Sequence, residues 1–333
     1  MGQHSAKVYH EKPNDDSTQA RQLYSKGAHT KRQFSSGVAT DIGGRPYQED
    51  RYIVIDNLQS YSPHVTVPSA LYIVLDGHGG FQCAEFVKTN FVDIFCQTEE
   101  FQSCDYAAAL RVTFKKLEKT WVEYAVLSKM EGWSSGTCVL ASFVVQSGMY
   151  VAWVGDCRMA GYNDHDQKHV QHVTTDHKPG SPKELSRILK VGGSVKHVHV
   201  HGGCFRSVKG PDRVFPGGLA VARSIGTIRC KDARLGAVKG AVISDAEVYY
   251  FTPSSSSNWF VMASDGLWDY YPKSQQLSKI ICNKKDSVVE ASDMAKYIMG
   301  TIRTSRRLNR APDNCTILVI KMRIEDDDRI DRH

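Results

Sequence analysis

The stretch Leu71-Tyr72-Ile73-Val74-Leu75-Asp76-Gly77-His78-Gly79-Gly80 decides how this chain folds and where its chemistry lies. The apolar, partly β-branched residues 71–75 predict a buried strand. The glycines that follow allow a sharp turn and a close approach of the backbone to a ligand. Residues 81–95 then show the apolar spacing of a helix. A strand, an acidic glycine-rich elbow and a helix present a carboxylate, a carbonyl and an imidazole together. We therefore predict that Asp76 is a metal ligand and His78 a proton donor.

Length and composition limit the class of protein. With 333 residues, 41% of them hydrophobic and 23% charged, the chain can bury a large core as one large domain or two ordinary ones. It has no apolar run of the roughly 18 residues that a membrane-spanning helix needs. Its cysteines number 9, an odd count without CxxC pairs, which favours reduced thiols in the cytoplasm or nucleus. The spread-out charge of +6 favours phosphorylated, anionic partners and gives no nucleic-acid footprint.

The two ends of the sequence are polar and lack periodicity. We expect a flexible N-terminal tail over 1–33, one domain over 34–322 and a fraying C-terminal tail over 323–333. The first residues lack the apolar core of a secretion signal. Gly2 suits N-myristoylation, but Ala6 stands where that signal needs Ser or Thr. An ordinary tail is therefore favoured, and membrane association through Gly2 stays an alternative.

Between the tails, short β-rich runs joined by tight turns predict antiparallel sheet. Strands are expected at 34–42, 51–55, 71–75, 137–146, 149–154, 159–162, 242–252, 259–263 and 315–322. Helices are expected at 81–95, 106–128, from about 181, at 273–282 and at 287–306.

Several carboxylates fall at the ends or beginnings of these strands. They are Asp50, Asp76, Asp265 and Asp313, with Asp156 in a tight turn and Asp269 shortly after Asp265. Taken singly, each is well explained as turn chemistry. Two separate strand–Asp–Gly elbows together with two more strand-edge aspartates are harder to explain in that way.

Clustered carboxylates repel one another and raise one another's pKa unless a cation neutralises them. All-oxygen ligands select hard ions such as Mg²⁺ or Mn²⁺. Two such ions can generate a nucleophile at neutral pH and clamp an in-line phosphoryl displacement. Arg45 could then bind the phosphate through its planar fork of donors.

At this point the sequence resembles the metal-dependent protein Ser/Thr phosphatases of type 2C, the PPM family. The matching blocks are Arg45–Asp50, Leu75–Gly80, Ser135–Thr137, Val154–Arg158, Thr175–Pro179, Leu219–Gly226, Ala263–Asp269 and Asp313–Thr316. One block alone would be weak evidence, but the blocks occur in the family's order and together span residues 34 to 321, nearly the whole chain outside the tails.

The resemblance implies an α+β fold in which two antiparallel sheets form a central sandwich with helices on both outer faces. It implies hydrolysis of phosphoserine and phosphothreonine in proteins by direct attack of a metal-bridging hydroxide, without a phosphoenzyme. A monomer is also implied.

The resemblance also implies residue roles. Asp50, Asp76, the carbonyl of Gly77, Asp265 and Asp313 match ligands of two Mg²⁺ or Mn²⁺ ions. Glu49 matches a residue that orients metal-bound water, Arg45 the phosphate-binding arginine and His78 the general acid. Asp156 and Asp269 match carboxylates of a third, weaker metal site.

Two regions depart from the family's pattern. Thr227 stands where the family usually has Asp. Because no core metal ligand comes from that position, we expect it to alter the neighbourhood of the flap without abolishing catalysis. The variable flap, about 191–218, contains His197, His199 and His201 at alternating positions. They could bind a metal, but an exposed polar strand is favoured because no carboxylate or cysteine is expected in register beside them.

Two other functions compete with an active phosphatase. A pseudophosphatase would bind phosphoproteins without turnover, but such proteins usually lose a core ligand, and here the four core aspartates, Arg45 and His78 all remain. A metal-dependent nuclease could use the same carboxylates, but its basic track with interleaved aromatic residues is absent.

Overall fold

The computed structural model describes residues 31–128, 134–163, 165–202, 206–253, 258–284, 290–305 and 312–325. A compact unit, Arg32–Arg323, contains nearly all of them. The expected tails, with Gly2, lie almost wholly outside the described residues, so the division into tails and domain stays a prediction. Within the described part of the chain, no helix is long and apolar enough to cross a membrane.

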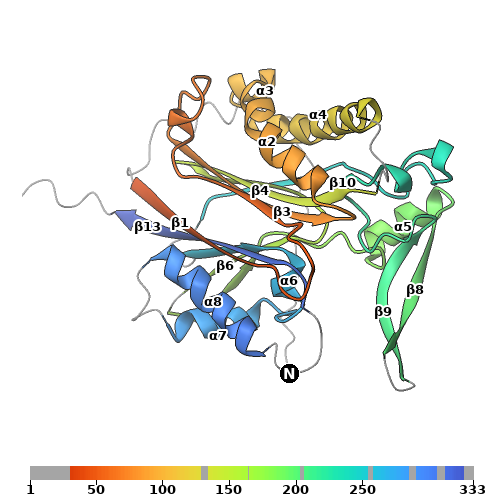
Figure 1. Ribbon diagram of the computed structural model, residues 1–333. Helices are drawn as coiled ribbons and strands as arrows, with labels where there is room; N and C mark the ends of the chain where they lie inside the picture. The colour runs from red at the N-terminus through yellow and green to blue at the C-terminus, as the bar shows by residue number, and fades with distance from the viewer. Residues whose placement is uncertain are drawn as a thin grey trace, which may run out of the picture. The chain divides into compact units, whose positions relative to one another are not determined.

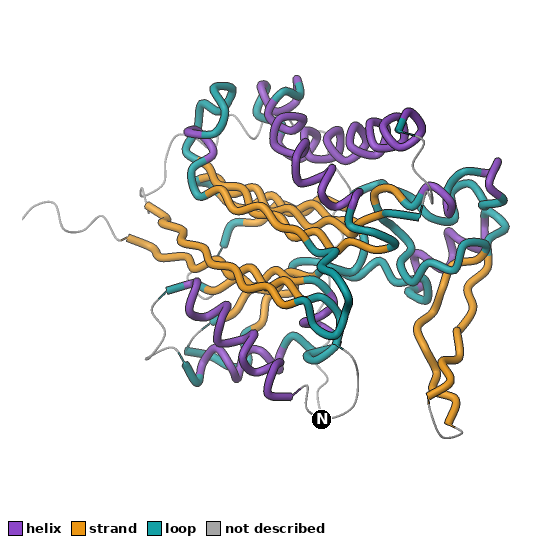
Figure 2. Tube along the Cα trace, viewed as in Figure 1, coloured by secondary structure: helices purple, strands orange, loops and turns teal. Residues whose placement is uncertain are grey.

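Two sheets form the centre of this unit (Figures 1 and 2). The first has the order β1 (Lys31–Asp41), β13 (Cys315–Glu325), β12 (Trp259–Ala263), β6 (Arg158–Tyr162) and β7 (Val170–His172). The second has the order β11 (Glu247–Phe251), β5 (Gly148–Val154), β4 (Gly136–Val145), β3 (Ser69–His78) and β2 (Arg51–Ile55), and β10 (Ile225–Gly226) pairs with β4. The pairs β12–β13, β6–β12, β2–β3, β3–β4 and β4–β5 are all antiparallel.

Helices cover the outer face of each sheet (Figure 1). The second sheet carries α2 (Gln82–Cys96), α3 (Glu99–Gln102) and α4 (Tyr106–Leu127), and the first carries α7 (Gln275–Cys282) and α8 (Ala291–Ser305). The α2 helix buries Val87, Phe91 and Phe95, spaced by one helical turn, in one core with Leu75 of β3. The α8 helix buries Ile298 in a second core. The predicted α+β sandwich with helices on both outer faces is confirmed.

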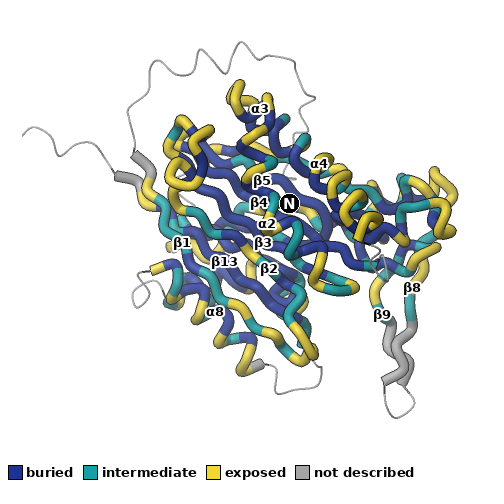
Figure 3. Tube along the Cα trace, turned by 45° about the horizontal axis from the view of Figure 1, so that its top comes forward, coloured by how far each residue is buried: buried dark blue, intermediate teal, exposed yellow. Residues whose placement is uncertain are grey.

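The interior of the sandwich explains why its strands are so apolar. Every residue of β4 is buried, as expected for a strand covered on both faces. Figure 3 shows this burial along the central strands. Between the sheets, the rings of Phe251 on β11 and Phe260 on β12 pack with centroids 5.9 Å apart.

The structure differs from the sequence prediction along β3. This strand does not end at Leu75 but continues through His78, because Asp76, Gly77 and His78 pair with the first residues of β4. The turn begins only at Gly79, whose φ is +65°.

The flap, where the sequence favours an exposed polar strand, contains two paired strands. β8 (Ser194–Gly202) and β9 (Arg206–Phe215) form a separate antiparallel hairpin, in contact with α5 (Pro182–Lys190) at its base (Figure 1). A carboxylate does stand in register there, because Asp212 on β9 lies opposite His197 and contacts its ring. The side chains of His199 and His201 lie outside the described residues. The remaining short elements are α6 (Asp265–Trp268), η1 (Leu58–Ser60), η2 (Ile228–Cys230) and η3 (Ala233–Leu235).

Candidate active site

The end of β3 directs two of the predicted site side chains between the sheets. Successive side chains of a strand point to opposite faces, and Leu75 packs in the helix-side core, so Asp76 and His78 face the other sheet. Between them, a Cβ at Gly77 would lie 2.3 Å from the carbonyl oxygen of Glu49. Only glycine therefore fits at this point.

The other sheet brings two more carboxylates to the same end of the sandwich. Asp265 follows β12, and Asp313 precedes β13, the strand paired with it. The two segments pack closely, since a Cβ at Gly266 would lie 2.1 Å from the carbonyl oxygen of Asn314. The backbone N–H of Asp265 points at Oδ2 of Asp76, 3.4 Å away, so the site joins both sheets.

Asp50 completes the set from the start of β2. Its Oδ2 accepts a hydrogen bond of 2.8 Å from the hydroxyl of Ser264, and that hydroxyl accepts one of 3.0 Å from the N–H of Thr316. Sequence reasoning did not find Ser264, although it directly precedes a predicted ligand. Its hydroxyl orients the carboxylate of Asp50, which is only 5% exposed.

Burial and mutual repulsion make the ionised form of these carboxylates costly. Burial, with some repulsion from Asp313, raises the pKa of Asp50 to about 7. Burial, and then repulsion from Asp265, raises the pKa of Asp76 well above its usual value. The pKa of Asp265 is raised well above its usual value by burial and next by Asp156.

A hard divalent cation fits this donor set. Oxygens of Asp76, Asp156 and Asp265 lie within 4.8 Å of one another. All the donors are oxygens, the atoms that Mg²⁺ and Mn²⁺ prefer. A cation held there would remove the repulsion that raises these pKa values.

Asp156 lies in the turn between β5 and β6 and differs from the other carboxylates. Its Oδ2 forms an ion pair with Nζ of Lys178, and its Oδ1 accepts a contact of 3.2 Å from the thiol of Cys138. Burial favours the neutral acid, but Lys178 outweighs that effect and the pKa of Asp156 is lowered. Sequence reasoning quoted Lys178 only as part of a matching block and did not predict this ion pair. Asp269, at the end of α6, is exposed and adds to the repulsion at Asp265.

The remaining predicted residues lie around this centre. Glu49 Oε1 accepts a hydrogen bond of 2.5 Å from the N–H of Gly80. Arg45, with half of its side chain exposed, donates to Oδ2 of Asp313 at 2.5 Å. An exposed ion pair of this kind contributes little stability, so the guanidinium can exchange it for a phosphate.

His78 faces a residue whose role the sequence did not reveal. Its Nε2 lies 2.8 Å from Oγ1 of Thr227, and burial lowers the pKa of the ring to about 4. The structure therefore places Thr227 against the predicted general acid.

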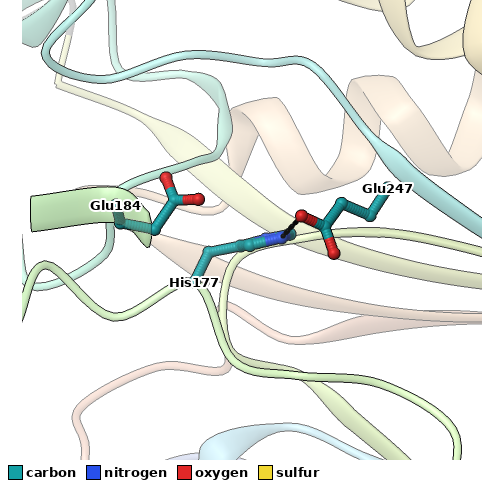
Figure 4. Close-up of side chains that lie close together, drawn as sticks. All are labelled: His177, Glu184 and Glu247. Atoms are coloured by element: carbon teal, nitrogen blue, oxygen red, sulfur yellow. Dashed lines mark ion pairs between the residues drawn. The ribbon is translucent and has the colours of Figure 1, made fainter. Parts of the chain in front are cut away.

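A second group of possible metal ligands, His177, Glu184 and Glu247, lies apart from these carboxylates (Figure 4). His177 Nε2 is 3.7 Å from Glu247 Oε1. Both glutamates already have cationic partners: Arg187 and Arg223 bond Glu184, while Lys183 and Arg223 pair with Glu247. Charge neutralisation within the protein argues for a structural network here rather than a metal site.

Comparison with known proteins assigns the chain to a family. The family model for protein phosphatase 2C matches residues 34–304, and the chain belongs to that family, whose members are Ser/Thr protein phosphatases. It is 28% identical to probable protein phosphatase 2C 27 of Arabidopsis thaliana over 86% of this chain and 68% of that protein. It is 30% identical to probable protein phosphatase 2C 22 of the same plant over 71% of this chain but 56% of that protein.

Solved structures agree on the fold. The serine-threonine phosphatase 2C from Toxoplasma gondii superposes with a TM-score of 0.69 at 21% identity, covering 90% of this chain and 96% of that one. A sex-determining protein of C. elegans superposes with a TM-score of 0.68 at 19% identity, over 87% of this chain and 65% of that one.

Proposed function

We propose that this chain is an active Mg²⁺- or Mn²⁺-dependent protein phosphatase that hydrolyses phosphoserine and phosphothreonine in proteins. The observation that carries the proposal is the set of carboxylates at Asp50, Asp76 and Asp265. They lie in or next to strands of both sheets and are held where burial makes their charge costly. A protein keeps such a group when a ligand compensates for its cost.

Each residue has a proposed part. Asp50, Asp76, Asp265, Asp313 and the carbonyl of Gly77 would hold two ions, and Asp156 and Asp269 a third, weaker one. When bound, the ions would activate water as hydroxide for direct attack on phosphorus and would neutralise charge on the phosphoryl oxygens.

The other polar groups would handle the substrate and the leaving group. Arg45, exposed at the rim, would bind the phosphate through two parallel N–H donors. Glu49 would orient water beside the ions. His78 would give a proton to the leaving serine or threonine alkoxide, which is a poor leaving group without it.

Hydrolysis of a phosphothreonine peptide with and without Mn²⁺ or Mg²⁺ tests the proposal. We expect turnover only with the ion, and its loss in Asp76→Asn and Asp265→Asn. Asp93→Asn, which changes an exposed aspartate on the outer helix α2, is the matched control. Mn²⁺ should raise the melting temperature of the wild type and the control but not of the two site variants.

Two outcomes would contradict parts of the proposal. Mn²⁺ binding without turnover at any ion concentration would favour a phosphoprotein-binding pseudophosphatase. Retained turnover in Asp76→Asn would place the metal centre elsewhere.

A further inference from the structure

Thr227 has a backbone conformation that its residue type disfavours. Its φ of +51° and ψ of +48° lie in the left-handed region, where a β-branched residue is an outlier. The conformation is held by hydrogen bonds from its N–H to Ser135 O at 2.9 Å and from the N–H of Cys230 to its carbonyl at 2.8 Å. Strain of this kind persists where the surrounding structure holds it, often at functional sites.

The strained residue directs a buried hydroxyl at His78. Thr227 is fully buried, and its Oγ1 lies 2.8 Å from His78 Nε2 and 3.2 Å from the hydroxyl of Ser224. Strand β10 creates this contact, because Gly226 pairs with Gly136, which also pairs with His78. A Cβ at Gly136 would lie 2.0 Å from Oγ1 of Thr227 and 2.6 Å from Nε2 of His78, so only glycine leaves room for it.

The hydrogen bond to the imidazole explains why a hydroxyl is suited to this position. A hydroxyl can both donate and accept a hydrogen bond. When Nε2 of the ring carries no proton, the hydroxyl of Thr227 donates to it. When Nε2 carries a proton, the same hydroxyl accepts and turns its own hydrogen toward Ser224. A carboxylate could only accept, and a methyl group could do neither.

We propose that Thr227 is a positioning residue for His78: its hydroxyl fixes the orientation of the imidazole from which the leaving alkoxide takes its proton. The inference rests on the proposed function in assigning that proton transfer to His78. The contact itself stands on geometry, since His78 lies on β3 and Thr227 directly follows β10, both strands pair with β4, and Gly136 keeps the space between the two side chains open.

Leaving-group dependence separates this role from a merely structural one. Proton donation matters for a serine or threonine alkoxide and much less for an aryl phosphate, whose leaving group is already stable. Thr227→Val keeps the β-branched shape and removes the hydroxyl. We expect it to lower kcat on a phosphothreonine peptide about 10- to 100-fold, part of the 10²–10⁴-fold that general acid catalysis supplies, with KM little changed. The loss on p-nitrophenyl phosphate should be at most a few-fold.

Two further variants make the test specific. Thr227→Ser should recover most of the lost peptide activity, because it restores the hydroxyl. In a His78→Gln background, Thr227→Val should cause no further loss, because a residue that acts through His78 has nothing left to position. Equal losses on both substrates, no recovery with serine, or additive effects in the double variant would overturn the proposal.

A spectroscopic readout keeps the inference independent of turnover. The ¹⁵N resonances of the His78 ring can be assigned by their absence in His78→Gln. Thr227→Val should shift the Nε2 resonance, and Thr227→Ser should leave it close to the wild type. If the wild type hydrolyses no phosphopeptide, the proposed function fails while this experiment still tests the contact. An unchanged Nε2 resonance in Thr227→Val would overturn it.

Discussion

Replacing Arg223 by methionine should destabilise the protein strongly, and the loss should not come from a lost metal site. Arg223 Nε donates to Oε1 of Glu184 at 3.0 Å, and the two side chains are only 7% and 2% exposed. Its Nη1 also donates to the carbonyl of Asp245 at 3.0 Å. The ion pair thus connects helix α5 to the segment that leads into β10.

The expected loss in the free energy of unfolding depends on the partner that Glu184 keeps in the variant. Breaking a buried ion pair by removing one partner costs about 3–5 kcal/mol, because the remaining charge stays buried. Arg187 still donates to Oε2 of Glu184 at 2.7 Å, which places the loss near the lower limit, about 3 kcal/mol. At about 2–4 °C per kcal/mol for a domain of this size, the melting temperature should fall by about 6–12 °C.

Urea denaturation of the wild type, Arg223→Met and the double variant Arg223→Met/Glu184→Met measures this loss. The double variant should recover stability relative to the single one, since no charge is left uncompensated at Glu184. Added Mn²⁺ should not rescue Arg223→Met specifically. A loss below about 1 kcal/mol would refute the reasoning, because it would fall within the range of exposed ion pairs. Specific rescue by Mn²⁺ would refute the conclusion that His177, Glu184 and Glu247 form a structural network.

Three further outcomes are expected. Gly77→Ala would bring a methyl group 2.3 Å from the carbonyl oxygen of Glu49, so it should lower the free energy of unfolding in urea by about 1–3 kcal/mol. It should also displace Asp76 and weaken the Mn²⁺-dependent rise in melting temperature; an unaltered Mn²⁺ response would contradict this. The pKa of Glu247 is lowered from 4.5 to about 2, chiefly by the facing His177. The stability that this carboxylate adds is present above pH 4.5 and is lost as the pH falls through 2, so the wild type should lose more stability over that interval than Glu247→Gln. Equal losses of unfolding free energy in the two proteins as the pH falls would argue against it. Arg45→Lys keeps the charge but loses the planar fork, so kcat/KM on phosphopeptides should fall about tenfold with little change in melting temperature; an unchanged kcat/KM would remove Arg45 from the phosphate site.

The two Asp–Gly elbows were predictable from the sequence because their signals are local. An apolar run followed by Asp76-Gly77 or Asp265-Gly266 identifies a buried strand and a carboxylate near its end, although β3 continues through His78, and hairpin turns indicate antiparallel pairing. The partners of those carboxylates were not predictable in the same way. Ser264 reaches Asp50 across 214 positions of the sequence, and no periodicity records which hydroxyl faces which carboxylate.

The ion pair of Lys178 was not predictable for the same reason. Its ammonium reaches Asp156 across 22 positions, from a loop to a turn. The pairing of β6 with β7 and the hydrogen bond of 2.9 Å from the N–H of His177 to the carbonyl of Gly155 hold the two segments together. The ion pair gives Asp156 a compensated charge, while Asp76 and Asp265 have raised pKa values. The carboxylates that appear equivalent in sequence are therefore unequal in their need for a metal.

Thr227 shows how a sequence difference can be noticed before the contact that it makes is known. Its departure from the family pattern was visible, and the neighbouring flap was the nearest variable segment to which it could be assigned. β10 is only 2 residues long, too short for any periodic signal, yet its pairing with β4 turns the hydroxyl of Thr227 toward His78. A difference that concerned substrate access should change KM across substrates. A difference in the partner of His78 should instead change kcat, and more for alkyl than for aryl leaving groups, so the kinetic parameter that responds in Thr227→Val distinguishes the contact from an effect of the flap.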